Sequence, residues 1–318
     1  MGMSELPPPP SPQPRERRSV PRTITPLSVA AVDGTGILHF PLRQEELSDT
    51  VRTALQEDGA FNDITTIATV VSDRRSRATL VARESAVVCG VPLALESFRL
   101  LDPKAAIRVD HEDGTRVRAG DPVLFVTGHA RGLLSAERVA LNYMQRLSGI
   151  ATLTSRYVDA VRGTKAKILD TRKTTPGWRL LEKYAVRAGG GTNHRMDLST
   201  GVLIKDNHLA ALDGDIGKAV SRSRALAPKG VPIEVECDNI EQVDRAAAAG
   251  ADVILLDNMS LEQMAECVRL VNGRAILEAS GGVSLGSVKR IAETGVDWIS
   301  VGALTHSAPS MDLALDFE

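Results

Sequence analysis

The chain has 318 residues, of which 43% are hydrophobic and 25% charged, so it is long enough for one large and one smaller domain. A net charge of −2 with only 3% aromatic residues argues against a basic, base-stacking surface of the kind that binds nucleic acid. No apolar run approaches the about 18 residues that a membrane-spanning helix needs. Three widely spaced cysteines without a CxxC pair predict a reduced, cytoplasmic protein without structural disulfides or structural zinc.

The first 40 residues are rich in Pro, Ser and Arg and show no periodicity. They predict a disordered tail over 1–40, with at most a short ordered segment at 37–40. The tail contains no apolar stretch like that of a secretory signal. Leu47, Val51 and Leu55 then lie four apart, which predicts an amphipathic helix that ends at Gly59.

Residues 77–127 contain short strand-like runs, among them ATLVARE and PVLFVTG, which turn residues separate and a helix at 93–101 interrupts. This mixture predicts an α+β sandwich domain over 41–145. A long helix-compatible stretch follows, with Ser135 as its expected N-cap and Gly149 as an expected bend or break. Such a stretch can carry the chain into a second domain.

After Lys165 the chain alternates short apolar strands with longer helices. The expected strands are AKILD, GVLI, PIEVE, DVILLD, RAILEA and DWISV, and the expected helices cover 177–188, 215–227, 239–249, 260–271 and 284–294. This rhythm indicates a parallel sheet that is buried on both faces. Because a full TIM barrel needs eight repeats, the prediction is an incomplete TIM-like α/β barrel over 146–302 that carries the active site, with 303–318 returning to the small domain.

Polar residues or glycines follow all six strands, at the edge where such barrels form their active sites. In chain order, these strand ends carry cations, then carboxylates, then glycines: Thr171-Arg172-Lys173, Lys205-Asp206-Asn207, Glu236-Cys237-Asp238, Asp257-Asn258, Ser280-Gly281-Gly282 and Gly302-Ala303. His194 and Arg195 follow a triple glycine and join the cations. The pattern predicts a pocket for a strongly anionic small molecule.

The other cations of this region follow a different pattern. Arg179, Lys183 and Arg187 recur at helical spacing, which predicts a solvated helix face.

The carboxylates and glycines suggest two further kinds of site. The period of two in PIEVE places Glu234 and Glu236 on one face of the strand, so both are expected to point into the barrel. Glu236 and Asp257 lie at adjacent strand ends and fit Mg²⁺, although internal ion pairs with Lys205 or Lys173 fit the spacing equally well. The glycine loops after the last two strands, one of them before a helix expected near Ser284, resemble barrel phosphate sites.

The segments DTRKTTPGWRLLEKYAVRAGGGTNHR, LIKDNH and ERVALN resemble the quinolinate phosphoribosyltransferase family, also called carboxylating nicotinate-nucleotide pyrophosphorylases. The resemblance extends from about Leu47 to the C-terminus through EDGAFNDITT, IEVECDNIEQ, ADVILLDNM, EASGGVSL and VGALTHSAP. It implies that quinolinate and 5-phosphoribosyl 1-diphosphate give nicotinate mononucleotide, diphosphate and carbon dioxide, a step in de novo NAD synthesis.

The resemblance also implies residue roles. Quinolinate would be held by Arg138, Arg172, His194, Arg195 and Lys205, and phosphoribosyl diphosphate by Lys173, Glu236, Asp257, Ser280, Gly281 and Gly302. Lys173 would lie between the two substrates, and Glu236 and Asp257 would also hold Mg²⁺. The implied catalytic residues are Lys173, Lys205, Glu236 and Asp257. The implied assembly is a homodimer in which Arg138 of one subunit completes the pocket of the other.

Three alternatives remain at this point. One is the paralogue associated with molybdenum transport, which shares the fold but is less consistent with the full basic set. Another is a Schiff-base barrel lyase, because Lys205 or Lys173 at a strand end is also a nucleophile's position. The third is a binding or regulatory protein without turnover, against which the density of titratable groups at one face argues.

Overall fold

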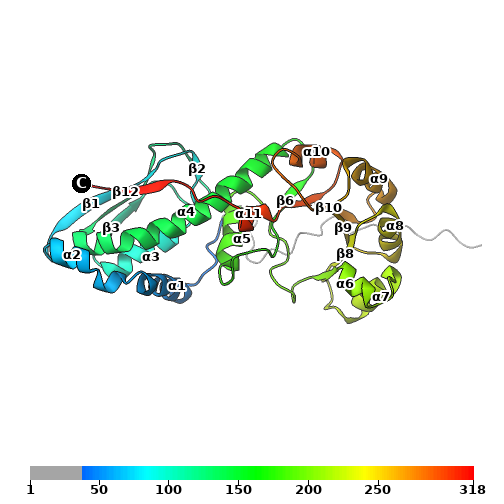
Figure 1. The fold of residues 1–318 in the computed structure, drawn as a ribbon, viewed down its shortest axis with the longest axis horizontal. Helices are drawn as coiled ribbons and strands as arrows, with labels where there is room; N and C mark the ends of the chain where they lie inside the picture. The colour runs from blue at the N-terminus through cyan, green and yellow to red at the C-terminus, as the bar shows by residue number, and fades with distance from the viewer. Residues whose placement is uncertain (1–37) are drawn as a thin grey trace, which may run out of the picture.

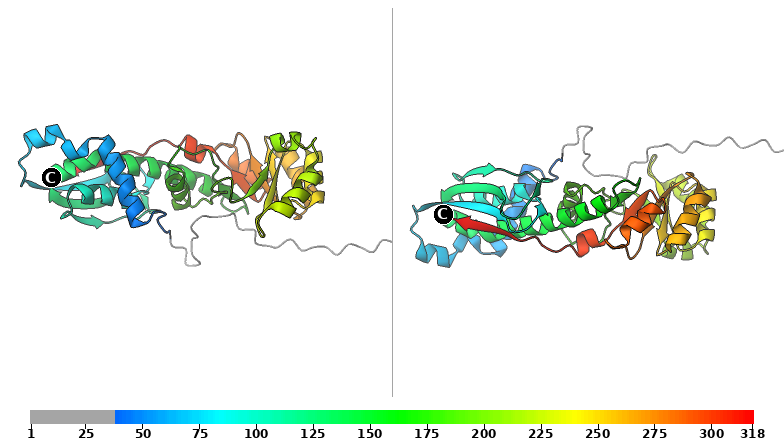
Figure 2. Two further views of the ribbon diagram at one scale, coloured as in Figure 1. Left: turned by 90° about the horizontal axis from the view of Figure 1, so that it is seen from below. Right: turned by 90° about the horizontal axis from the view of Figure 1, so that it is seen from above.

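The computed structural model describes residues 38–318, which form two parts joined by one long helix (Figure 1). The predicted tail lies outside the described residues except for residues 38–40, which belong to neither a helix nor a strand. The molecule is elongated in all three views, with a small sheet domain at one end and the second sheet toward the other (Figure 2). The C-terminus returns to the small-domain end.

An antiparallel sheet with the strand order β12-β1-β5-β3 forms the frame of the small domain. Its strands are β1 (Arg75–Ala82), β3 (Ala106–Val109), β5 (Pro122–His129) and β12 (Leu313–Phe317), and β2 (Ala86–Val87) pairs with β4 (Arg116–Val117). The helices are α1 (Gln44–Glu57), the 3₁₀ turn η1 (Ala60–Asn62), α2 (Ile64–Thr69) and α3 (Val91–Leu101). The predicted α+β organisation of this part is confirmed.

The helix α1 follows directly from its apolar spacing. Leu47, Val51 and Leu55 are all buried, and Gly59 takes a left-handed φ of 68° just after the helix ends. A positive φ is unfavourable for residues with a Cβ, so glycine allows the chain to leave the helix here. The predicted end of the helix at Gly59 is confirmed.

One face of the small sheet is apolar. Ala78, Leu80 and Ala82 alternate along β1 and share a core with Phe98 of α3 and Leu133 of the following helix. Because side chains alternate between the faces of a strand, this spacing leaves the other face of β1 half-buried or exposed. The helices therefore cover a single face of the sheet.

The helix α4 (Ala130–Ala160) joins the two parts and differs from its prediction. Its N-cap is His129, so Ser135 lies inside the helix, where its hydroxyl bonds Asp63 instead of capping. The helix also runs through Gly149 without a break. The predicted boundary at 145/146 thus falls within a continuous helix.

Gly149 is needed for close packing rather than for a bend. A Cβ at this position would lie 2.0 Å from the carbonyl oxygen of Pro309, in the segment that leads from α11 (Ala303–His306) to β12. The same segment is tied to α4 by hydrogen bonds from the Met311 N–H to the Gln145 carbonyl and from the Gln145 side chain to the Leu313 carbonyl, at 3.0 and 2.9 Å. The returning C-terminal segment therefore passes directly over the helix.

The second part contains a six-stranded parallel sheet with the order β6-β11-β10-β9-β8-β7. The strands are β6 (Lys167–Leu169), β7 (Val202–Ile204), β8 (Ile233–Cys237), β9 (Val253–Asp257), β10 (Ile276–Ser280) and β11 (Trp298–Ser300). The remaining helices are α5 (Arg179–Ala188), α6 (Asp206–Ala210), α7 (Ile216–Leu226), α8 (Ile240–Ala249), α9 (Leu261–Val271) and α10 (Val288–Glu293). Since β6 and β7 are the two edges, the predicted incomplete barrel is confirmed.

The two faces of this sheet have different chemistry. Outward residues such as Val235 are buried in one core with Val243 of α8 and the other surrounding helices. Val253 and Trp298, the first residues of β9 and β11, form a small inner apolar cluster with Leu169, the last residue of the short strand β6. The inner positions nearest the carboxyl ends of β8, β9, β10 and β11 carry polar side chains, and this is where the candidate site lies.

Within the described part of the chain, no helix has the length and apolar character needed to cross a membrane.

Replacing Gly149 with alanine tests the packing of the C-terminal segment. The added methyl would overlap the Pro309 carbonyl, so we expect the free energy of unfolding to fall by about 1–3 kcal/mol, although alanine is the better helix former. Chemical denaturation measures the change. The control is Gly217→Ala in α7, where the nearest atom to a new Cβ is 3.4 Å away. Equal effects of the two substitutions would contradict the packing role.

Candidate active site

A cavity of about 670 Å³ opens at the carboxyl ends of the parallel strands. Its lining is mostly polar: Thr171, Arg172, Lys173, His194, Arg195, Leu203, Lys205, Glu236, Leu255, Asp257, Asn258, Glu278, Ser280, Gly281, Gly282 and Ser300. The structure thus brings together the predicted strand-end cations, carboxylates and glycines. Two predicted site residues do not line it, namely Arg138, which is exposed on α4, and Gly302, which lies beside Lys173.

The cations and carboxylates meet at an ion pair. Lys205 Nζ lies 2.5 Å from Glu236 Oε2, across the neighbouring ends of β7 and β8. Asp257, at the end of β9, accepts a hydrogen bond from Asn258 at 2.7 Å. The cavity therefore has a basic side at β6 and β7 and an acidic side at β8 and β9, which the Lys205–Glu236 pair connects.

The basic side has unused hydrogen-bonding capacity. The Nε of Arg172 is buried and has no hydrogen-bond partner among the described residues. Burial and the charge of Arg172 lower the pKa of Arg195, whose guanidinium donates to the Gly201 carbonyl at 2.8 Å. Two neighbouring cations and a buried N–H without an acceptor favour an anionic ligand at this position.

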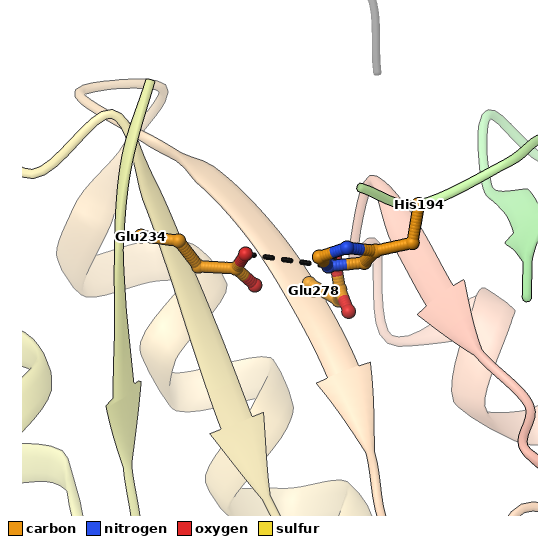
Figure 3. A group of neighbouring side chains, drawn as sticks. All are labelled: His194, Glu234 and Glu278. Atoms are coloured by element: carbon orange, nitrogen blue, oxygen red, sulfur yellow. Dashed lines mark ion pairs between the residues drawn. The ribbon is translucent and has the colours of Figure 1, made fainter. Parts of the chain in front are cut away.

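His194 lies between two buried glutamates in the cavity wall (Figure 3). Its Nε2 is 3.3 Å from Glu234 and 3.5 Å from Glu278, and its Nδ1 accepts the Arg195 backbone N–H at 2.8 Å. These three side chains are also the one group of potential metal ligands found among the described residues. Both ring nitrogens of His194 are thus engaged by the chain itself.

Opposing effects set the protonation of this cluster. Burial lowers the pKa of His194, but Glu278 and Glu234 raise it, and the net result is a pKa of about 10 instead of 6.5. Burial, followed by the charge of Glu278, raises the pKa of Glu234. The cluster therefore keeps a proton between the ring and the two carboxylates at neutral pH.

Glu278 and Ser300 also line the cavity, although the sequence predicted neither as a site residue. Glu278 is fully buried, and the Ser300 hydroxyl donates to its Oε1, while its Oε2 faces His194. A signal was present, because Glu278 precedes Ser280 by two residues and therefore points to the same face of β10.

The interpretation of Arg179, Lys183 and Arg187 as a solvated helix face is wrong. Lys183 is completely buried, where it forms an ion pair with Asp170 and donates to the His194 carbonyl at 3.1 Å. Arg179 donates to Thr174 at 3.0 Å, and Arg187 is half-buried and donates to the His39 carbonyl at 3.4 Å. Helical spacing correctly predicts that these residues share one face of α5, but this face packs against other parts of the protein instead of facing solvent.

The glycines that follow β10 differ in how strictly their positions require glycine. Gly281 has a φ of 93°, and a Cβ on it would lie 2.2 Å from the Asn258 side chain, so only glycine fits. Gly282 has a φ of 57° and open space beside it. The following helix begins at Val288, later than expected, because residues 284–287 form a turn that the Ser284 and Ser287 hydroxyls stabilise. The predicted helix start near Ser284 is therefore wrong.

The pKa of His194 predicts how its contribution to stability depends on pH. A folded-state pKa raised from 6.5 to about 10 contributes stability that is complete below pH 6.5 and is lost as the pH rises through 10. We expect His194→Gln to lower the melting temperature most at pH 6.5 and least at pH 10. Thermal unfolding of both proteins across this range measures the difference. A difference that does not change with pH would contradict the assignment.

Comparisons with known proteins agree with this geometry. Residues 63–148 match the N-terminal domain of quinolinate phosphoribosyl transferase, and residues 150–316 match its C-terminal domain. The nicotinate-nucleotide pyrophosphorylase (carboxylating) of Mycobacterium leprae is 49% identical over 84% of this chain and 96% of its own length.

Solved structures are similar over most of their length. The nicotinate-nucleotide pyrophosphorylase of Francisella tularensis superposes with a TM-score of 0.82 at 40% identity, covering 87% of this chain and 98% of that one. The enzyme of the same name from Ehrlichia chaffeensis gives a TM-score of 0.81 at 43% identity, over 85% and 98% of the two chains. The chain therefore belongs to the quinolinate phosphoribosyltransferase family.

Proposed function

We propose that the chain joins quinolinate to the ribose of 5-phosphoribosyl 1-diphosphate and releases diphosphate and carbon dioxide, giving nicotinate mononucleotide for NAD synthesis. The observation that carries the substrate assignment is the buried, unpartnered Nε of Arg172 in a cavity wall that also contains Lys173, Arg195 and Lys205. A planar dicarboxylate supplies the acceptor oxygen that the Arg172 Nε lacks among the described residues, and its negative charges suit the neighbouring cations.

The two sides of the cavity suit the two steps of the reaction. The ring nitrogen of quinolinate attacks the ribose carbon as diphosphate leaves, and the carboxylates of Glu236 and Asp257 stabilise the positive charge that develops on that carbon. The bond between the ring and the 2-carboxylate then breaks to release carbon dioxide, and its electron pair stays on the ring carbon until that carbon takes up a proton. The cations of the basic side stabilise this negative charge, with Lys173 and Lys205 closest to the boundary between the substrates.

The neighbouring residues support roles in binding phosphoribosyl diphosphate. Ser280 and Gly281 line the cavity beside the acidic strands, and Gly282 leaves its backbone open. A Cβ at Gly302 would lie 3.0 Å from the His306 ring and 3.3 Å from the Lys173 side chain, so both side chains would have to shift slightly to admit one. We propose that these residues hold the 5′-phosphate.

Glu236 and Asp257 also fit a magnesium ion. Both are carboxylates on adjacent strands of one cavity, and Mg²⁺ usually takes one or two protein carboxylates and completes its shell with water and phosphates. Bound there, the ion would neutralise diphosphate. In this structure the Glu236 carboxylate pairs with Lys205 instead, so Lys205 and a magnesium ion would compete for it.

Arg138 supports a site shared between two subunits. It is exposed on α4 and absent from the cavity of its own chain. We propose a homodimer in which Arg138 enters the cavity of the partner and binds quinolinate there. The cytoplasmic location stays a prediction.

A direct assay tests the reaction. Quinolinate, phosphoribosyl diphosphate and Mg²⁺ should together give equal amounts of carbon dioxide and nicotinate mononucleotide, and borohydride should trap no covalent adduct. Folded protein without turnover would refute the proposal. An adduct on Lys205 or Lys173 would instead favour the Schiff-base lyase. The relatives give no support to that alternative or to the molybdenum-transport paralogue.

Arg172→Lys tests recognition of the planar carboxylates. Because lysine cannot form the two parallel bonds of a guanidinium, we expect the substitution to weaken quinolinate binding by about 1–3 kcal/mol. Calorimetric titration measures the affinity. Arg83→Lys is the matched control, since Arg83 pairs with Asp316 on the small domain. Unchanged affinity in Arg172→Lys would remove this residue from the quinolinate site.

Asp257→Asn tests the metal and ribose roles together. We expect this variant to fold with an unchanged melting temperature and to lose most of its turnover, because a neutral amide binds Mg²⁺ and stabilises a developing cation poorly. Wild-type turnover should also require Mg²⁺ and stop with a chelator. A lowered melting temperature with unchanged activity per folded molecule would indicate a structural role instead.

Mixing two inactive variants tests the shared site. Random exchange between Arg138→Ala and Lys205→Ala subunits places both variants in half of the dimers, and one of the two sites in each mixed dimer is intact. We therefore expect up to about a quarter of the wild-type activity to return. Absence of any recovery after verified subunit exchange would show that Arg138 does not act in the partner's site.

A further inference from the structure

We propose that Lys183 is a positioning residue of the anion pocket, which together with Asp170 and Asn193 fixes the two basic loops of the cavity relative to each other. The inference rests on the proposed function, because its consequence is the affinity for quinolinate. Lys183 is not a residue of the cavity wall and acts through the backbone that carries the residues of that wall.

The contacts of Lys183 and Asp170 converge on His194. The Lys183 ammonium donates to the His194 carbonyl at 3.1 Å, and the His194 N–H donates to the Asp170 carboxylate at 2.8 Å. Lys183 and Asp170 also form an ion pair with each other. Both polar groups of the His194 backbone are therefore held by this one pair.

Asn193 completes the cluster. Its side-chain amide donates to Asp170 at 2.6 Å and to the Lys183 carbonyl at 2.8 Å, and it is almost fully buried. All three side chains are thus enclosed and bonded to one another. The cluster contains one positive and one negative charge, so its internal charges balance.

The cluster connects both basic loops because of where its members lie in the chain. Asp170 directly follows β6 and precedes Arg172 and Lys173, whereas Asn193 directly precedes His194 and Arg195. A movement at either loop would break hydrogen bonds inside a closed space. The cluster therefore sets the separation between Arg172 and Arg195. This separation must stay constant if the two side chains are to bind two carboxylates on one rigid, planar ring.

The helix that carries Lys183 is itself fixed. Its neighbour Glu182 is fully buried, pairs with Arg146 of α4 at 2.7 Å, and accepts the Thr175 N–H at 3.1 Å. The loop before His194 is also held, because a Cβ on Gly189 would lie 2.3 Å from the Ala151 carbonyl of α4. Both α5, which carries Lys183, and the loop before His194 are therefore held against the long helix α4.

Stability alone does not account for such a pair. Removing two charges from water costs several kcal/mol, and replacing a buried ion pair with apolar residues of similar size is often neutral or stabilising. Burial also raises the pKa of Asp170 and lowers that of Lys183, which is the signature of this cost. What an apolar pair could not supply is the simultaneous donor and acceptor for the backbone of His194.

Two variants test the proposal in the full-length protein. Lys183→Met keeps the length of the side chain and removes its ammonium, and Asp170→Asn/Lys183→Met also removes the remaining charge, so that no buried carboxylate lacks a partner. We expect quinolinate affinity to fall at least about ten-fold, since small misplacements of binding groups have effects of this size. Affinity for phosphoribosyl diphosphate should change by less than about two-fold, because its proposed binding groups lie mainly on other strands.

The matched control is Lys165→Met, which removes an ion pair with Asp297 near the amino end of the same sheet. It should leave both affinities unchanged. A folded double variant with wild-type quinolinate affinity would overturn the proposal, and so would an equal loss of affinity for both ligands, which indicates general disruption. Wild-type protein that binds no quinolinate would refute the proposed function as well, which separates the two failures.

Discussion

The alternation of side chains along six parallel strands is the constraint on which the site depends. Every second residue of a strand must face the interior, whatever its chemistry. In this protein these interior positions include apolar residues such as Trp298, the buried Glu278 in the middle of β10, and Glu236 near the carboxyl end of β8. Glu236 and Glu278 line the cavity, and apolar interior residues such as Val253 and Trp298 form a small cluster of their own. Fold and site are therefore two consequences of one periodicity.

Much of this could be predicted from the sequence because local patterns were sufficient. The strands were short, apolar and regularly spaced, so their order along the chain and their carboxyl ends followed directly. Arg172, Lys205, Glu236 and Asp257 could be identified because each lies at or just after the end of a strand, and parallel strands bring such positions to one edge. For these residues, the neighbouring sequence alone was enough to place the side chain at the site.

The errors arose where a distant segment decides the outcome. The spacing of Lys183 is the same for a solvated cation and for one enclosed by two loops, and only the presence of Asp170 distinguishes them. Gly149 similarly appeared to be a helix breaker, because nothing near it in the sequence indicates that Pro309 crosses the helix. Glu278 depends on no distant segment, because the period of two along β10 places it on the same face as Ser280.

The pairing of β12 with β1 has a consequence for how the protein is made. The strand nearest the beginning of the small domain finds its partner in Leu313–Phe317, the last strand of the chain, in register from Ala78 with Phe317 to Ala82 with Leu313. During synthesis β1 leaves the ribosome well before β12, and one edge of β1 stays unpaired until β12 has been made. Long-range pairing of this kind slows folding, and an exposed strand edge invites association with other chains. The sheet of the small domain is therefore completed only after the barrel between β1 and β12 has been synthesised, and the edge of β1 is exposed throughout that time.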